Sequence, residues 1–188
     1  MASSSSAVPT ERVVAAPSVT ASASLGLLGV LPVPAGARAW PTNTNRLMSL
    51  VSFVQASYIK SAWGQEEALY ARRGFVAAVE RGWTNADGSE QFIALVRLAT
   101  PAGAASALDE QISDWKDQPG VTAVADPGAG AAGFSDPTLD SQGNAHVNFF
   151  FAVGNTVVRV IEYTAATPDP AAAKTLVEEQ YQRLKNGS

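Results

Sequence analysis

The only histidine of the chain, His146, is the side chain best suited to acid–base chemistry near neutral pH. It follows a glycine- and aspartate-rich segment, 126–144, which includes Asp136 and Asp140. A histidine acts as a general base when a nucleophile and an orienting carboxylate lie beside it. No G-x-S-x-G motif singles out a serine for this role. We therefore expect His146 to be an ordinary residue at the start of a strand, and keep a hydrolase that uses His146 and the 126–144 loop as an alternative.

Two arginines occupy matching contexts, Arg97 in Val-Arg-Leu and Arg159 in Val-Arg-Val, each on a predicted strand that leads into a helix. Ion pairs with Glu80 and Glu162 are the expected role. The alternative is a pair of anion-binding groups, because a guanidinium presents several N–H donors to a carboxylate or a phosphate. The candidate ligand-binding residues are Arg97, Arg159, His146, Asp136 and Asp140.

Residues 128–133, Gly-Ala-Gly-Ala-Ala-Gly, match the G-x-G-x-x-G pattern of dinucleotide-binding turns. Such a turn must open a helix whose N-terminus meets the pyrophosphate. Pro137 would interrupt that helix as it begins, and no acidic residue follows about twenty positions later. We interpret the segment as a loop rather than a nucleotide site.

The same segment carries Asp126, Asp136, Asp140 and Asn144, whose oxygen atoms are of the type that binds calcium. Their spacing does not match an EF-hand, and such residues also stabilise turns through their own side chains. The chain has no cysteine, which excludes disulfides and sulfur-ligated zinc. We predict no metal site and no cofactor.

The elements that position these residues form two β-β-α units. In each unit two strands with alternating apolar residues are joined by a short turn and lead through Thr-Pro into an alanine-rich helix. The units suggest an internal repeat, for which coincidence is the alternative. The predicted elements are strands 75–83 and 91–99 with a helix from 101 to about 118, and strands 146–153 and 156–164 with a helix ending near 185.

The preceding residues predict further elements. The proline-rich segment 25–46 is expected to be extended and to pack Trp40 on the domain. Apolar spacing predicts helices at about 46–60, with Asn45 or Thr44 as the N-cap, and at 65–72. The fold class is α+β, with an antiparallel sheet of five or six strands.

The four tryptophans are Trp40, Trp63, Trp83 and Trp115. They could line an apolar pocket, although large aromatic side chains more often lie in the core.

Composition narrows the function. The net charge is −4 and basic residues do not cluster, so the chain lacks the basic surface that nucleic-acid binding requires. No apolar stretch approaches the length of a membrane span, and we expect any export signal to have been removed. Residues 1–24 are mostly Ser, Ala, Val, Thr and Pro, and predict a disordered tether ahead of a single domain at 25–188.

Several local patterns resemble those of uncharacterised exported proteins and lipoproteins of actinobacteria. They are Leu-Pro-Val-Pro-Ala-Gly-Ala at 31–37, Arg-Gly-Phe at 73–75, Trp83 with Asp-Gly at 87–88, and Pro-Ala-Gly-Ala at 101–104. Members have a signal peptide, often a lipidated cysteine, a tether and a small α+β domain. The resemblance covers residues 28–185 and implies an extracytoplasmic location, either secreted or membrane-tethered.

The sequence thus favours a non-enzymatic extracytoplasmic binding module for a small ligand or a protein partner, monomeric or homodimeric. The alternatives are a carrier with an apolar pocket between sheet and helices, and the hydrolase described above.

Overall fold

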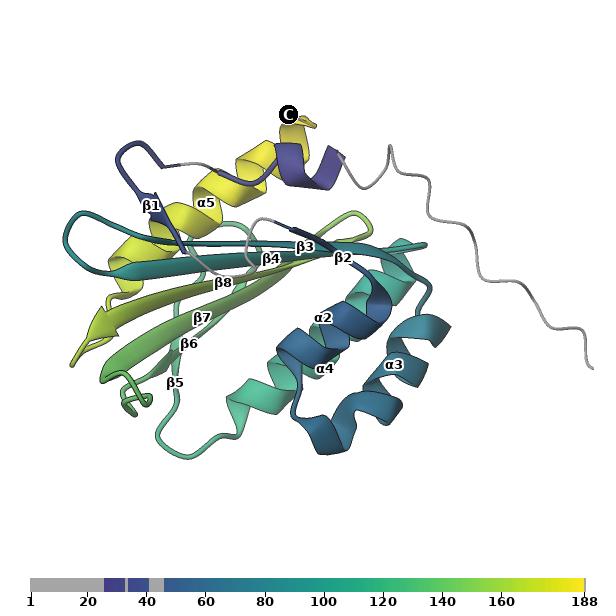
Figure 1. The fold of residues 1–188 in the computed structure, drawn as a ribbon, viewed down its shortest axis with the longest axis horizontal. Coiled ribbons are helices and arrows are strands. Elements are labelled where there is room, and N and C mark those ends of the chain that lie inside the picture. Colours follow the sequence, from purple (N-terminus) through teal and green to yellow (C-terminus); the bar gives the residue numbers. More distant parts are fainter. Residues whose placement is uncertain (1–25, 33, 41–45, 188) are drawn as a thin grey trace, which may run out of the picture.

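The computed structural model describes residues 26–32, 34–40 and 46–187, whose strands form one eight-stranded antiparallel sheet (Figure 1). The strand order is β1-β3-β4-β8-β7-β6-β5, and β2 also pairs with β3. The elements are β1 (Arg38–Ala39), β2 (Arg46–Met48), α2 (Leu50–Ser57), the 3-10 turn η1 (Lys60–Ala62), α3 (Trp63–Arg72), β3 (Phe75–Thr84), β4 (Glu90–Leu98), α4 (Pro101–Lys116), β5 (Thr122–Val124), β6 (Ala132–Asp136), β7 (Asn144–Val153), β8 (Thr156–Ala165) and α5 (Pro170–Asn186).

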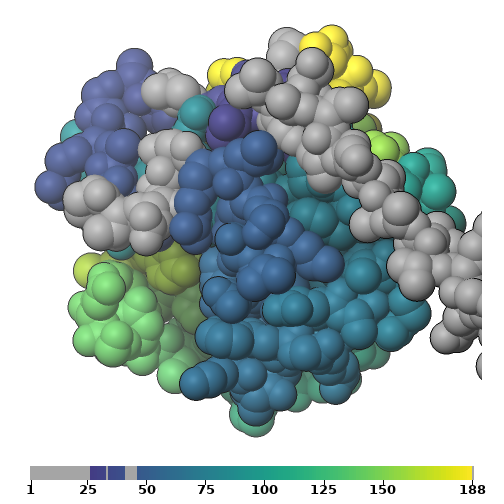
Figure 2. All heavy atoms as spheres, turned by 45° about the vertical axis from the view of Figure 1, so that its right-hand side comes forward, coloured from purple at the N-terminus to yellow at the C-terminus, as the bar shows by residue number. Residues whose placement is uncertain are grey.

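Helices cover both faces of the sheet, but they cover them differently (Figure 1). Helix α5 and the short helical segment 26–29 pack on one face over a continuous apolar core. Helices α2, α3 and α4 pack on the other face, over a smaller core. In Figure 2, the blue α2–α3 region occupies much of the face that comes forward in this view. The face under α5 is thus the main core, and the opposite face is where a cleft remains.

The α+β class and the antiparallel sheet are confirmed, whereas the prediction of five or six strands is wrong because the sheet has eight. Strands β1 and β2 are two and three residues long, too short for apolar alternation to reveal them. Strand β6 lies within the segment predicted to be a loop. It contains Gly133, where a Cβ would overlap the ring of Phe149 on β7. The glycine that suggested a loop instead admits a neighbouring aromatic ring.

The predicted helix at 46–60 is shorter than expected. Residues 46–48 pair with β3 as β2, and α2 begins only at Leu50. Its N-cap is Ser49, whose hydroxyl accepts a hydrogen bond from the Ser52 backbone N–H at 3.2 Å. The proposed caps Asn45 and Thr44 lie outside the described residues, as does the predicted tether at 1–24. The single-domain assignment remains a prediction.

The two β-β-α units recur as an order of elements and not as an arrangement in space. Helix α4 packs on the α2–α3 face of the sheet, and α5 packs on the opposite face. A two-fold axis perpendicular to the sheet, between the antiparallel strands β4 and β8, is the symmetry that could relate the two units. Such an axis would place α4 and α5 on the same face of the sheet. The proposed internal repeat is therefore not supported by the packing.

Strand β8 carries a buried acid on the α5 face. Glu162 is 1% exposed, and burial, with a contribution from the carboxylate of Asp169, raises its pKa to about 7. The folded state therefore binds this proton more tightly than the unfolded state, where the pKa is near 4.5. The contribution of Glu162 to stability is fully present below about pH 4.5 and is lost as the pH rises through about 7.

We expect Glu162→Gln to remove this pH dependence. At pH 8 the variant should be more stable than the parent, by up to about 3 kcal/mol, because it carries no buried negative charge. At pH 4.5 the two proteins should differ little. Urea unfolding at both pH values measures the difference, and a variant that is less stable than the parent at pH 8 would contradict the assignment.

Candidate functional site

The register of the sheet sets the floor of the cleft. Glu80 on β3 lies opposite Ala94 on β4, Ala94 lies opposite Arg159 on β8, and Arg159 lies opposite Phe150 on β7. These side chains therefore form one row across four strands on the α2–α4 face. Further along β8, Tyr163 pairs with His146 in a parallel row.

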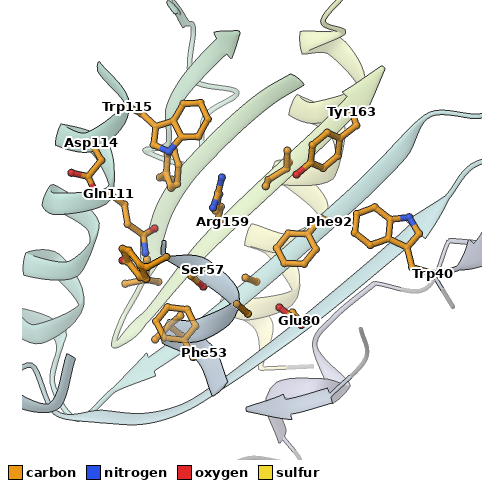
Figure 3. A pocket seen from close by; sticks show the side chains of 17 residues that line it. Trp40, Phe53, Ser57, Glu80, Phe92, Gln111, Asp114, Trp115, Arg159 and Tyr163 are labelled. Carbon is orange, nitrogen blue, oxygen red and sulfur yellow. The ribbon is translucent and has the colours of Figure 1, made fainter. Parts of the chain in front are cut away.

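Above this floor, α2 and α4 leave an open cleft of about 450 Å³ (Figure 3). Figure 3 shows Trp40 and Phe92 on one side, Trp115 on the other, and Arg159 between them. The volume falls in the range of small-molecule sites, and aromatic rings supply much of the lining.

One wall of the cleft is built around Trp40, which directly follows β1. Its backbone N–H donates to the Gly82 carbonyl oxygen at 3.1 Å. A Cβ at position 82 would overlap the indole, so the ring can lie on the strand only because this residue is glycine. The indole stacks on Phe92, with centroids 6.1 Å apart, and is tilted against Tyr163 at 6.3 Å. The prediction that Trp40 packs on the domain is confirmed.

The other wall comes from α4. Trp115 lies 6.2 Å from the Phe150 ring and meets His146 edge to face at 5.4 Å, both measured between ring centroids. Trp115 thus belongs to the cleft, whereas Trp83 is 2% exposed in the core under α5. Trp40 and Trp115 therefore line the cleft, and Trp83 lies in the core, so both roles considered from the sequence occur.

Arg159 is the only positively charged residue that lines the described cleft. Its Nε and Nη2 donate to Oδ1 of the fully buried Asn148 at 3.1 and 2.9 Å. Its Cζ atom lies 5.6 Å from the ring centroids of both Trp115 and Phe150. No carboxylate in the described part of the chain forms an ion pair with it. Burial lowers the pKa of Arg159, although a guanidinium in a protein keeps its charge.

Two carboxylates also line the cleft. Glu80 is 8% exposed, and burial raises its pKa even though Arg46 Nε lies 3.2 Å from its Oε1. Asp114 on α4 has its pKa raised by desolvation and by the nearby Glu110. Glu80 is thus already neutralised by Arg46, and neither acid is paired with Arg159.

A hydrogen-bonded chain closes one end of the cleft. The hydroxyls of Tyr58 and Tyr70 lie 3.0 Å apart, and Gln111 Nε2 donates to the Tyr70 hydroxyl at 3.0 Å. Burial raises the pKa of both tyrosines, so both remain neutral at physiological pH.

The structure brings together three of the five candidate residues. Arg159 and His146 lie on the cleft face, and His146 Nε2 is 3.7 Å from Oδ2 of Asp136. Burial lowers the pKa of His146 although Asp136 acts in the opposite direction. Asp140 lies in the adjoining turn and accepts hydrogen bonds from the backbone N–H groups of residues 142 and 144. Arg97 is not part of this site, because it alternates onto the α5 face of β4.

The G-x-G-x-x-G segment has a structural role. The carboxylate of Asp126 accepts hydrogen bonds, all at 3.0 Å, from the backbone N–H groups of residues 128, 129, 130 and 131. Four converging N–H groups form an anion-binding nest of the kind that holds phosphates, and here an internal carboxylate fills it. Although desolvation acts against it, these bonds lower the pKa of Asp126. The interpretation as a loop therefore holds for residues 128–131, whereas residues 132 and 133 belong to β6.

No group of three or more His, Cys, Asp or Glu side chains within the described ranges could hold a metal ion. None of the helices that the structure describes is long and apolar enough to cross a membrane.

The architecture defines the protein as an α+β fold in which helices flank both faces of an antiparallel sheet. A solved structure with this fold is the crystal structure of the extracellular domain of PknH from Mycobacterium tuberculosis. The TM-score is 0.55 and the sequence identity 13%, over 89% of this chain and 92% of that chain. At this identity the similarity establishes the fold alone. No protein-family model and no curated protein matches the chain.

We expect Asp126→Ala to loosen the nest. The substitution leaves four backbone N–H groups without their acceptor, so amide hydrogen exchange at residues 128–131 should accelerate about ten-fold or more. Exchange in α5 should be unchanged. Asp117→Ala, at an exposed position just beyond α4, is the control; equal exchange in both variants would contradict a structural role for Asp126.

Proposed function

We propose that this protein is a non-enzymatic extracytoplasmic binding module whose small ligand occupies the cleft between the sheet and helices α2 and α4. The observation that carries the proposal is the cleft itself, an open volume of about 450 Å³ with aromatic walls and a few polar groups. Concave sites of this size and composition are the usual places where proteins hold small molecules.

The polar groups support a specific ligand rather than a general apolar carrier. Glu80, Gln111, Asp114 and Arg159 all line the cleft. Each of them would be desolvated by a purely apolar ligand that offers no hydrogen bonds, at a cost in affinity.

The arrangement around His146 supports a binding role over a hydrolytic one. Asp136 lies beside the imidazole, and Tyr163 faces it from β8 with ring centroids 5.9 Å apart, but no Ser, Thr or Tyr hydroxyl in the described part of the chain hydrogen-bonds to the imidazole. The missing component is the nucleophile that the hydrolase alternative requires.

Two observations support an extracytoplasmic location. The chain resembles exported actinobacterial proteins in its sequence patterns, and it shares its fold with a domain described as extracellular, from a mycobacterium.

We expect Ala94→Phe to block the cleft, because Ala94 lies on its floor next to Arg159 and a phenyl ring there would fill the volume that a ligand needs. Titration with the neutral dye Nile red should show saturable fluorescence enhancement with the parent and at least a ten-fold weaker affinity with the variant. Ala123→Phe, at an exposed position on β5, should behave as the parent. Equal dye binding by Ala94→Phe would contradict a ligand site in the cleft.

The non-enzymatic part of the proposal has a separate test. We expect neither the parent nor His146→Ala to turn over a panel of ester, amide and phosphate-ester substrates. Hydrolysis by the parent that is lost in His146→Ala would overturn it.

A further inference from the structure

The guanidinium of Arg159 has unused hydrogen-bonding capacity within the cleft. It has five N–H donors, and its two hydrogen bonds, from Nε and Nη2, both end on Oδ1 of Asn148. Nη1 has no hydrogen-bond partner in the part of the chain that the structure describes. Asn148 therefore fixes one edge of the guanidinium and leaves Nη1 available to a ligand.

The charge of Arg159 also lacks a counter-ion among the residues that the structure describes. The side chains that act electrostatically on it are Tyr163, Tyr58 and Tyr70, and these phenols are neutral at physiological pH. Glu80 is two strands away in the same row and is paired with Arg46. A desolvated cation without a partner is unfavourable, and an anionic ligand would compensate it.

The rings beside Arg159 define the rest of the ligand. Trp40 and Phe92 stand on one side, and Trp115 stands on the other (Figure 3). The rings of Trp115 and of Phe150, which neighbours Arg159 on the floor, each lie 5.6 Å from its Cζ atom. Aromatic walls on two sides of the cleft favour a flat apolar body, which can stack on a ring. Because Arg159 is the only cation among the described lining residues, the cleft offers one charged partner, which a single negative charge on the ligand would match.

We propose that the cleft binds a small organic monoanion, with its carboxylate on the guanidinium of Arg159 and a planar apolar body between the Trp40 and Trp115 walls. This inference rests on the proposed function, since it names the ligand class of the same cleft. The carboxylate accepts from the free edge of the guanidinium, and Asn148 holds the opposite edge.

A matched pair of probes separates the anion from its body: 2-naphthoate, and the neutral 2-naphthamide of nearly the same shape. In isothermal titration calorimetry, the parent should bind naphthoate about ten-fold or more tightly than naphthamide, because a hydrogen bond to a charged group is the stronger one. Arg159→Gln should abolish this preference and leave the naphthamide affinity within about two-fold of the parent.

A second variant guards against loss of folding in Arg159→Gln. Asn148→Asp keeps the shape of the side chain and places a carboxylate at the atoms that already contact Arg159. It should neutralise the guanidinium and weaken naphthoate binding about ten-fold, with naphthamide unaffected. Arg72→Gln, at an exposed position at the end of α3, is the control for net charge and should bind both probes as the parent does.

The outcomes distinguish this inference from the proposed function. Equal affinities for the two probes in the parent, or a naphthoate affinity that Arg159→Gln and Asn148→Asp leave unchanged, would overturn the anion assignment. The cleft proposal would stand in that case if Ala94→Phe still abolished dye binding. Absence of binding by Nile red and by both naphthalene probes would overturn both.

Discussion

The register of β8 is the constraint on which the candidate site depends. Successive side chains of a strand point to opposite faces, so Val158 and Val160 enter the core under α5 while Arg159 enters the cleft. A shift of one residue would bury the guanidinium in that core and expose valines to the cleft. Pairing with β4 on one side and β7 on the other prevents such a shift, because both neighbours also have one face in the α5 core. The core thus fixes the position of the charge without touching it.

Much of the scaffold could be predicted from the sequence because its signals are local. The alternation of apolar residues located both central hairpins to within a residue or two, and the Thr-Pro step at 100–101 located the start of α4. The Thr-Pro step at 167–168 precedes α5, which begins only at Pro170 with Asp169 as its N-cap. In β4 the alternation places Ile93 and Leu95 in the core under α5, and Ala94 and Val96 in the cleft. The alternation of apolar residues does not show which helix covers which face of the sheet. Arg97 and Arg159 therefore appeared equivalent in the sequence.

A pocket between sheet and helices was one of the alternatives, but the residues that line it could not be predicted because they are distant in the sequence. Trp40 and Trp115 lie beside Arg159 only in the folded sheet, where α4 and α5 pack on opposite faces. Which face each helix covers depends on tertiary packing. The single local signal for the Trp40 wall is Gly82, a glycine in the middle of a strand, which indicates that something packs closely on the backbone there. Asp126 is similar, since its position just before a glycine-rich turn is visible in the sequence but its four hydrogen bonds are not.

The two walls of the cleft differ in how firmly they are built. Trp115 is part of a helix of sixteen residues whose alanines pack into the core beneath it. Trp40 is held on the sheet by one backbone hydrogen bond and by ring contacts with Phe92 and Tyr163. The indole also packs directly on the backbone at Gly82, so its position depends on local contacts, whereas that of Trp115 depends on the packing of a whole helix. In the proposed binding mode, the two faces of a ligand would thus meet walls of different origin, one set by the packing of a helix and one set by contacts between single rings.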